Sequence, residues 1–350
     1  MQAVPKEPSS SRVAFSMLLL ASALAACTPS AQTAQSVGVP RNAIAVWHGV
    51  IPDSYTVGNE YSKIVSAPLV AHRPWTEVGR VAIPTLTIYP AHGKNTGVTV
   101  VVFPGGGYEI LAIDLEGTEI CAWMTSHGIT CVLSKYRVPG PQGYGRDAPY
   151  SRSGPYPESR VALEDAQRTL RLVRFHARQW GIDPHRIGAV GFSAGGHLVA
   201  ALSIYFGVRI YRPIDAADRQ SARPDFAAAI YPGHLSLSSA KWDASQDKGR
   251  VIVPNESSVP PSMRDFVLNP AIHVTARTPP TFIVQAQDDP EDDPNNSVAY
   301  YIALQNAHVP AELHVFAHGG HAFGLRPSAL PISNWPSLMY AWLGSIGVLR

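Results

Sequence analysis

The chain has 350 residues, of which 45% are hydrophobic and 15% charged, and its formal net charge is +2. This apolar content excludes disorder as the main state, and the length suits one large domain or two small ones. With 28 basic and 26 acidic residues, the chain lacks the excess of positive charge that is typical of nucleic-acid-binding proteins. The 31 prolines, roughly 9% against a usual 5%, predict long ordered loops, because proline does not fit helix interiors or central strands.

The first 26 residues are predicted to be an export signal rather than part of the fold. Lys6 and Arg12 precede an apolar run at residues 13–23. This run is too short for a permanent bilayer-spanning helix, but it fits the hydrophobic region of a secretory signal. The following Leu-Ala-Ala-Cys at residues 24–27 resembles the bacterial lipoprotein box, in which the cysteine is lipidated and becomes the first residue.

A lipid anchor on Cys27 is therefore expected, with an ordinary signal peptide as the alternative. Thr28 follows the cysteine, and by analogy with bacterial lipoproteins the absence of Asp there favours the outer membrane, facing the periplasm or the cell surface. Residues 27–45 are small and polar and predict a flexible tether. The tether would hold a single domain, residues 46–350, away from the membrane.

The body of the chain alternates between predicted strands and helices. The predicted strands are short apolar runs, typical of strands buried on both faces, at residues 98–103, 129–133, 187–190, 226–231, 281–285 and 312–316. The predicted helices lie at residues 116–126, 158–180, 194–204, 297–306 and 335–346. This alternation predicts an α/β fold with a mostly parallel central sheet and helices on both faces. Functional residues are expected just after strands, where sites form in such sheets.

The strongest motif is Gly-Phe-Ser-Ala-Gly at residues 191–195, between a predicted strand and a predicted helix. This is the context of a nucleophile elbow, a tight turn that exposes a serine hydroxyl above the sheet. The N-terminus of the following helix favours negative charge that develops nearby. We therefore predict that Ser193 is a catalytic nucleophile; the alternative is a glycine-rich turn with an inert serine.

A serine nucleophile needs a base, and the base needs an acid that orients it. The chain order of this fold class is serine, acid, histidine. After the strand at 281–285 come Asp288 and Asp289, and after the strand at 312–316 come His318 and His321. We favour Asp288 as the acid, with Asp289 as its rival, and His321 as the base over His318.

Glycines predict where the negative charge on the carbonyl oxygen is stabilised. Pro-Gly-Gly-Gly-Tyr at residues 104–108 follows the strand at 98–103 and lets backbone N–H groups approach the oxyanion. The residue after the nucleophile supplies another donor. We predict an oxyanion hole formed by the amides of Gly106, Gly107 and Ala194. A phosphate-binding loop is disfavoured, because the Lys-Ser/Thr of a P-loop is missing.

No cofactor is implied, and no metal site is favoured. The acidic run at residues 288–294 does not match an EF-hand loop, and the histidines at 314, 318 and 321 match no zinc motif. In the body, Cys121 and Cys131 are expected to be two buried thiols, with a disulfide as the alternative in an exported chain.

Several motifs together resemble the bacterial α/β-hydrolase esterases related to acetyl-xylan and acetyl esterases, a branch whose members often carry an endo-xylanase-like label. The resemblance covers roughly residues 45–350 and rests on PGGGY, KYRVP, WGIDPHRIGAVGFSAGGHL and the stretch from TPPTFIVQAQDD to GGHAFGL. It implies the α/β-hydrolase fold and the roles assigned above to Ser193, Asp288 and His321. One departure is DDPEDDPNNS at residues 288–297, which lacks the Val-Val-Pro that usually follows the aspartates.

The expected function is hydrolysis of short-chain carboxylic esters, with acetylated plant sugars such as acetylated xylan favoured as substrates. An exopeptidase or amidase with the same triad is an alternative, and so is a non-catalytic binding protein. No nucleic acid partner is expected, membrane association is expected only through the lipid on Cys27, and the oligomeric state stays open.

Overall fold

The computed structural model describes residues 43–141, 160–236 and 266–349. The predicted signal peptide, Cys27 and most of the predicted tether lie outside these residues. Ala43–Ala45, at the end of the predicted tether, form strand β1, which pairs antiparallel with β4 (Thr85–Tyr89). In the described ranges we find no helix with the length and apolar character needed to cross a membrane.

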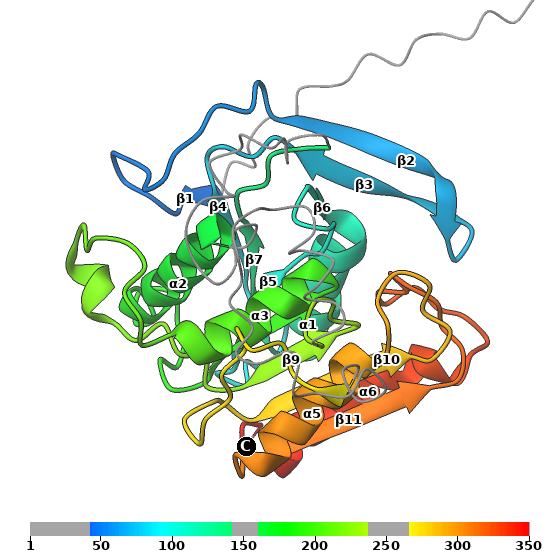
Figure 1. Cartoon of the computed structure of the whole chain (residues 1–350). Helices are drawn as coiled ribbons and strands as arrows, with labels where there is room; N and C mark the ends of the chain where they lie inside the picture. Colours follow the sequence, from blue (N-terminus) through cyan, green and yellow to red (C-terminus); the bar gives the residue numbers. More distant parts are fainter. Residues whose placement is uncertain (1–42, 142–159, 237–265, 350) are drawn as a thin grey trace, which may run out of the picture. The chain divides into compact units, whose positions relative to one another are not determined.

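The main sheet has the strand order β1-β4-β7-β5-β8-β9-β10-β11 (Figure 1). From β7 to β11 every pair of neighbours is parallel, whereas β4 joins β7 antiparallel. The parallel strands are β7 (Thr130–Lys135), β5 (Thr99–Phe103), β8 (Ile187–Phe192), β9 (Ala227–Ile230), β10 (Thr281–Ala286) and β11 (Ala311–Phe316). All six strands predicted from apolar runs are present, with ends within two residues of the prediction.

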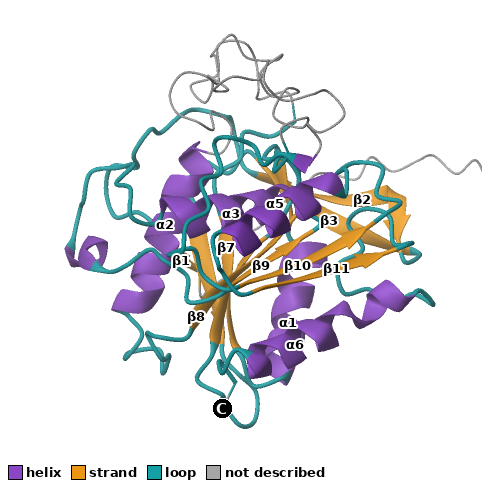
Figure 2. Ribbon diagram, turned by 60° about the horizontal axis from the view of Figure 1, so that its bottom comes forward, coloured by secondary structure: helices purple, strands orange, loops and turns teal. Residues whose placement is uncertain are grey.

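Helices cover both faces of this sheet, as predicted (Figure 2). The helices α1 (Glu119–Ser126) and α6 (Trp335–Ser345) pack on one face, and α2 (Arg160–Phe175), α3 (Ala194–Tyr205) and α5 (Asn295–Asn306) pack on the other. Alternate side chains of β5 enter the two layers: Val100 and Val102 pack toward α1 and α6, and Val101 and Phe103 toward α2 and α3. Such two-sided burial explains why the strand is apolar without alternation.

The sequence did not predict a second, three-stranded sheet formed by β2 (Tyr61–Val70), β3 (Arg73–Gly79) and β6 (Ile110–Ala112). Much of the β2–β3 hairpin is exposed, and β2 contains Pro68, so its residues show no continuous apolar run. Shorter turns precede α1 and α6 and follow α3 as η1 (Asp114–Thr118), η6 (Pro331–Asn334) and η3 (Ala216–Arg219).

A disulfide links Cys121 in α1 to Cys131 in β7, with the two Cα atoms 5.2 Å apart. The expectation of two separate buried thiols was therefore wrong. Both residues are completely buried and lie in the layer between the sheet and α1. Their helix-to-strand contact brings the sulfur atoms within bonding range, which the spacing of ten residues alone could not reveal.

Candidate active site

Ser193 lies in the sharp turn between β8 and α3, in a backbone conformation with φ 51° and ψ −121° that few non-glycine residues adopt. Two flanking glycines make the turn possible. A Cβ atom on Gly191 would lie 2.0 Å from the carbonyl oxygen of Gly195, and one on Gly195 would lie 2.1 Å from that of Phe103. The strand–turn–helix context predicted for the motif is thus present, with the serine at its apex.

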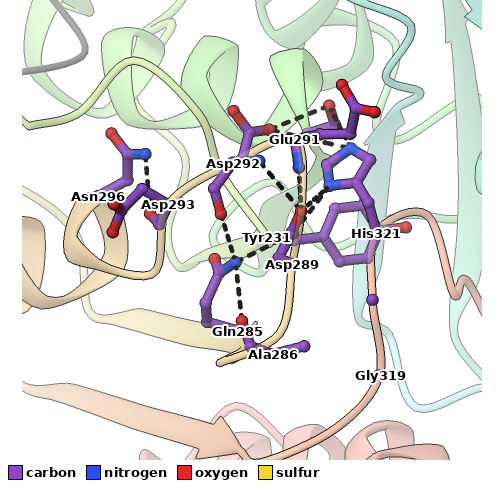
Figure 3. A network of polar contacts seen from close by, with 12 residues as sticks. Tyr231, Gln285, Ala286, Asp289, Glu291, Asp292, Asp293, Asn296, Gly319 and His321 are labelled. Carbon is purple, nitrogen blue, oxygen red and sulfur yellow. Dashed lines mark hydrogen bonds and ion pairs between the residues drawn. The ribbon is translucent and has the colours of Figure 1, made fainter.

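Three side chains from separate strand ends form a continuous hydrogen-bonded chain, of which Figure 3 labels Asp289 and His321. The Ser193 hydroxyl lies 3.0 Å from Nε2 of His321, and Nδ1 of His321 lies 2.8 Å from an Asp289 carboxylate oxygen. An imidazole that donates from Nδ1 to a carboxylate keeps Nε2 free to accept the serine proton. The structure therefore brings Ser193 and His321 together as predicted.

The prediction that Asp288 is the acid of this chain was wrong, and its rival Asp289 occupies the position. Asp289 is buried and faces His321, whereas Asp288 is exposed and accepts hydrogen bonds from the amides of Gly319 and Gly320 and from His318. The turn after β10 directs the two neighbouring carboxylates to different sides. Asp288 therefore anchors the loop that carries His321 without contacting its ring.

Surrounding charges favour the protonated form of His321. Burial alone would lower the pKa of this imidazole, but the hydrogen bond and charge of Asp289, with the charges of Asp292 and Glu116, raise the pKa above its usual value. The site thus stabilises the imidazolium that forms when the histidine takes a proton from the serine.

The amides predicted to bind an oxyanion face the same pocket as Ser193. Gly106, Gly107 and Ala194 all line this pocket, and within the described residues none of their N–H groups donates a hydrogen bond. Gly106 has a φ of 128°, and a Cβ atom there would lie 2.3 Å from the carbonyl oxygen of Ile110. Only glycine fits that position, so the loop can present its backbone to a ligand.

Sequence reasoning missed a buried carboxylate beneath this loop. Glu116 in η1 accepts hydrogen bonds from the Gly105 amide (2.7 Å) and from the Tyr231 hydroxyl (2.8 Å). The Tyr231 ring in turn packs edge-on against His321, with 5.0 Å between ring centroids. Burial raises the pKa of Glu116, and the charge of His321 opposes that rise. Glu116 thus connects the glycine loop to the histidine, a link that its position in a predicted helix did not indicate.

The pocket above Ser193 has a volume of about 870 Å³. One wall is apolar and comes from the β2–β3 hairpin, with Leu69 and Trp75 among its residues. Another part of the lining is polar and includes His234, Asp292 and Asn296. In the described part of the chain, no group of three or more His, Cys, Asp or Glu side chains is arranged to hold a metal ion.

A family model described as "alpha/beta hydrolase fold" matches residues 148–325. The chain is 28% identical to an acetylxylan esterase of Xylanibacter ruminicola over 65% of its length, and 27% identical to an endo-1,4-beta-xylanase B of Butyrivibrio fibrisolvens over 74% of its length. It spans only 42% and 37% of these two curated relatives.

Among solved structures, an acetyl ester-xyloside bifunctional hydrolase from Caldicellulosiruptor lactoaceticus is 31% identical, with a TM-score of 0.64. The alignment covers 89% of this chain and 99% of that one. The expected resemblance is confirmed by these matches and by the fold. The chain therefore belongs to the α/β-hydrolase fold family.

Proposed function

We propose that this protein is a serine esterase that hydrolyses short-chain carboxylic esters, with acetyl esters favoured. The observation that carries the proposal is the hydrogen-bonded chain Ser193–His321–Asp289 in a pocket that Gly106, Gly107 and Ala194 also line. A base, an orienting acid and oxyanion donors in this arrangement are what a Ser-His-Asp nucleophile uses to cleave acyl groups.

In the proposed reaction, His321 takes the proton of the Ser193 hydroxyl as Oγ attacks the ester carbonyl. The amides of Gly106, Gly107 and Ala194 stabilise the resulting oxyanion, while Asp289 stabilises the imidazolium. His321 then gives the proton to the leaving alcohol, and the acyl group stays on Ser193. Water deprotonated by His321 releases the acid and restores the serine.

The relatives and the pocket both support an acetylated carbohydrate as the substrate. The names of two relatives in the comparison refer to acetyl esters. A pocket with an apolar wall and a polar wall suits an alcohol that has apolar and hydroxyl-bearing faces, as a sugar has. We therefore propose acetylated plant polysaccharides or their oligosaccharides, such as acetylated xylan, as the physiological substrate class.

Hydrolysis assays with Ser193→Ala test the reaction. The wild-type protein should cleave p-nitrophenyl acetate, and the variant should lose at least about 10³-fold in kcat/KM. A fluorophosphonate probe should label the wild type and not the variant. Wild-type rates should fall along a series of aryl esters of rising acyl length, and acetylated xylo-oligosaccharides should be deacetylated. Equal activity of the two proteins, or cleavage of aminoacyl p-nitroanilides in preference to esters, would contradict the proposal.

We further propose that the protein is exported and anchored by a lipid on Cys27. The buried disulfide between Cys121 and Cys131 supports an oxidising compartment. Labelled palmitate should be incorporated into the wild-type protein in the bacterial envelope but not into Cys27→Ser. A label that persists in the variant would argue against Cys27 as the anchor.

A further inference from the structure

A second carboxylate, Asp292, faces the reacting atoms without belonging to the Ser193–His321–Asp289 chain (Figure 3). One of its carboxylate oxygens lies 3.4 Å from the Ser193 hydroxyl and 3.9 Å from Nε2 of His321. Only 16% of its side chain is exposed, and it lines the pocket. Since Asp289 already occupies Nδ1, the triad gives Asp292 no role.

The chain around Asp292 holds this carboxylate in place. Its amide donates to Asp289 (3.0 Å), and its carbonyl oxygen accepts from the side chain of Gln285 (3.1 Å). A Cβ atom on Gly233 would lie only 2.2 Å from the Asp292 carboxylate, so glycine there leaves room for it. The same residue that orients His321 thus also sets the backbone from which Asp292 reaches the pocket.

Asp292 lies close to the atom from which the leaving alcohol would receive its proton. In the proposed reaction, Nε2 of His321 delivers a proton to the oxygen of the leaving alcohol, so a group 3.9 Å from Nε2 faces that alcohol. In a vicinal diol, the two neighbouring oxygens can lie within hydrogen-bonding distance of each other. His321 and Asp292 can therefore bind the ester oxygen and an adjacent hydroxyl at the same time.

A substrate hydroxyl on Asp292 would also free the nucleophile. A serine hydroxyl has one proton to donate, and both His321 and Asp292 lie within reach of it. When another hydroxyl donates to Asp292, the serine proton is left to His321, which is the productive pairing. A substrate that carries this hydroxyl would thus bind to Asp292 and also direct the proton of Ser193 to His321, as the nucleophilic attack requires.

We propose that Asp292 is a specificity-determining residue that accepts a hydrogen bond from a hydroxyl on the carbon next to the ester oxygen, so that the site selects monoesters of vicinal diols. This inference rests on the proposed esterase function and names the substrate feature that the site recognises. A hydrogen bond to a charged acceptor changes affinity by about tenfold or more, which is enough to set a clear preference.

Three acetates that share a cyclohexyl ring test the inference: 2-hydroxycyclohexyl acetate, 2-methoxycyclohexyl acetate and cyclohexyl acetate. Each kcat/KM is divided by the rate constant of hydroxide-catalysed hydrolysis, which removes differences in intrinsic reactivity. The wild type should favour the hydroxy ester over the methoxy ester by about tenfold or more. Asp292→Asn, which keeps a neutral acceptor, should weaken this preference, and Asp292→Val should abolish it.

Glu312→Gln is the control, because it removes a carboxylate charge from an exposed position outside the pocket lining and should leave the hydroxy-to-methoxy ratio unchanged. Equal normalised rates of the wild type on all three esters would overturn the inference and leave the proposed function intact. An equal loss on all three esters in Asp292→Val would also overturn it, because Asp292 would then only support the triad. Wild-type protein inactive on every ester would overturn the proposed function, and this inference with it.

Discussion

The imidazole of His321 has a carboxylate near each ring nitrogen, Asp289 at Nδ1 and Asp292 near Nε2. Burial opposes protonation, but these charges and that of Glu116 raise the pKa of His321 above its usual value. A general base works only when unprotonated, so kcat/KM should fall as the pH drops through this raised pKa. The acid limb of the pH profile is therefore expected above the usual histidine pKa of about 6.5.

Asp292→Asn checks the sign of this effect. Removal of a negative charge near Nε2 should lower the pKa of His321 and shift the acid limb to lower pH. The measurement is kcat/KM for p-nitrophenyl acetate from about pH 5 to about pH 9. A limb that stays in place, or that moves to higher pH, would show that Asp292 does not act on His321 through its charge.

The neighbouring aspartates after β10 should differ sharply in their contribution to catalysis. Asp289→Asn keeps the shape of the side chain but no longer holds the useful tautomer of His321, and we expect kcat/KM to fall by about 10³- to 10⁴-fold. Asp288→Asn weakens the contacts with His318 and with the amides of Gly319 and Gly320, none of which reaches the His321 ring, and we expect a loss below about tenfold. Circular dichroism of both variants controls for folding. Similar losses in the two variants would contradict this assignment.

Adjacent residues explain why the sequence left this choice open. The order of serine, acid and histidine along the chain located the acid to within one position, because the carboxyl ends of parallel strands meet at one edge of the sheet. Which of Asp288 and Asp289 turns inward depends on the conformation of the turn after β10. Hydrophobic periodicity does not predict the direction of polar side chains in a loop. The first acid after the strand was a reasonable choice, but it was the wrong one.

At the scale of elements, η1 acts as a support beneath the glycine loop. Its Glu116 accepts from both the Gly105 amide and Tyr231, and it is buried. Glu116→Ala should therefore lower kcat for aryl acetates by roughly ten- to a hundredfold with little change in KM, because two buried donors lose their acceptor and the oxyanion amides shift.

Glu116→Gln separates this positioning role from a general loss of structure. Glutamine keeps a carbonyl acceptor but brings an NH₂ group opposite a donor, so its loss should lie between those of wild type and Glu116→Ala. Thermal unfolding measured in parallel reports on the fold. A large rise in KM at unchanged kcat would assign Glu116 to substrate binding instead of to the geometry of the oxyanion hole.

The elements that the sequence missed share a physical cause. Strands buried on both faces appear as apolar runs, so β5, β8 and β10 could be predicted, and the helices between them follow from amphipathic spacing. The β2–β3 hairpin has neither signal, since solvent covers much of it. It nevertheless supplies the apolar wall of the pocket, so the part of the site that determines substrate shape was the least predictable.

At the scale of the whole molecule, a buried charged network joins distant parts of the chain. Arg137, just beyond β7, donates to Asp165 and Glu164 in α2 and to the carbonyl oxygen of Pro52. The indole of Trp47 donates to the same Asp165. The segment after β1 is thereby fixed to the helix layer. Charged side chains in a helix are expected to be solvated, so sequence pattern alone did not indicate this network.

Glu164 should make the stability of the whole fold depend on pH. Burial, together with the negative charges of Asp53 and Asp165, raises the pKa of its carboxyl group to about 8. The positive charge of Arg137, 3.1 Å away, lowers this pKa but does not cancel the rise. A carboxyl whose pKa is higher in the folded state stabilises the fold while it is protonated. This stabilisation is fully present below the unfolded pKa of about 4.5 and is lost as the pH rises through about 8.

Glu164→Gln removes this titration, because the amide is neutral at every pH. Between about pH 5 and about pH 8.5, the free energy of unfolding of the variant should therefore rise relative to that of the wild type by about 4 kcal/mol. Urea unfolding of both proteins across this range measures the difference. Glu291→Gln is the control, since that side chain is exposed and its replacement should leave the pH dependence of the wild type unchanged. Parallel curves for wild type and Glu164→Gln would mean that Arg137 keeps Glu164 ionised throughout this range, and that the two side chains form a buried ion pair.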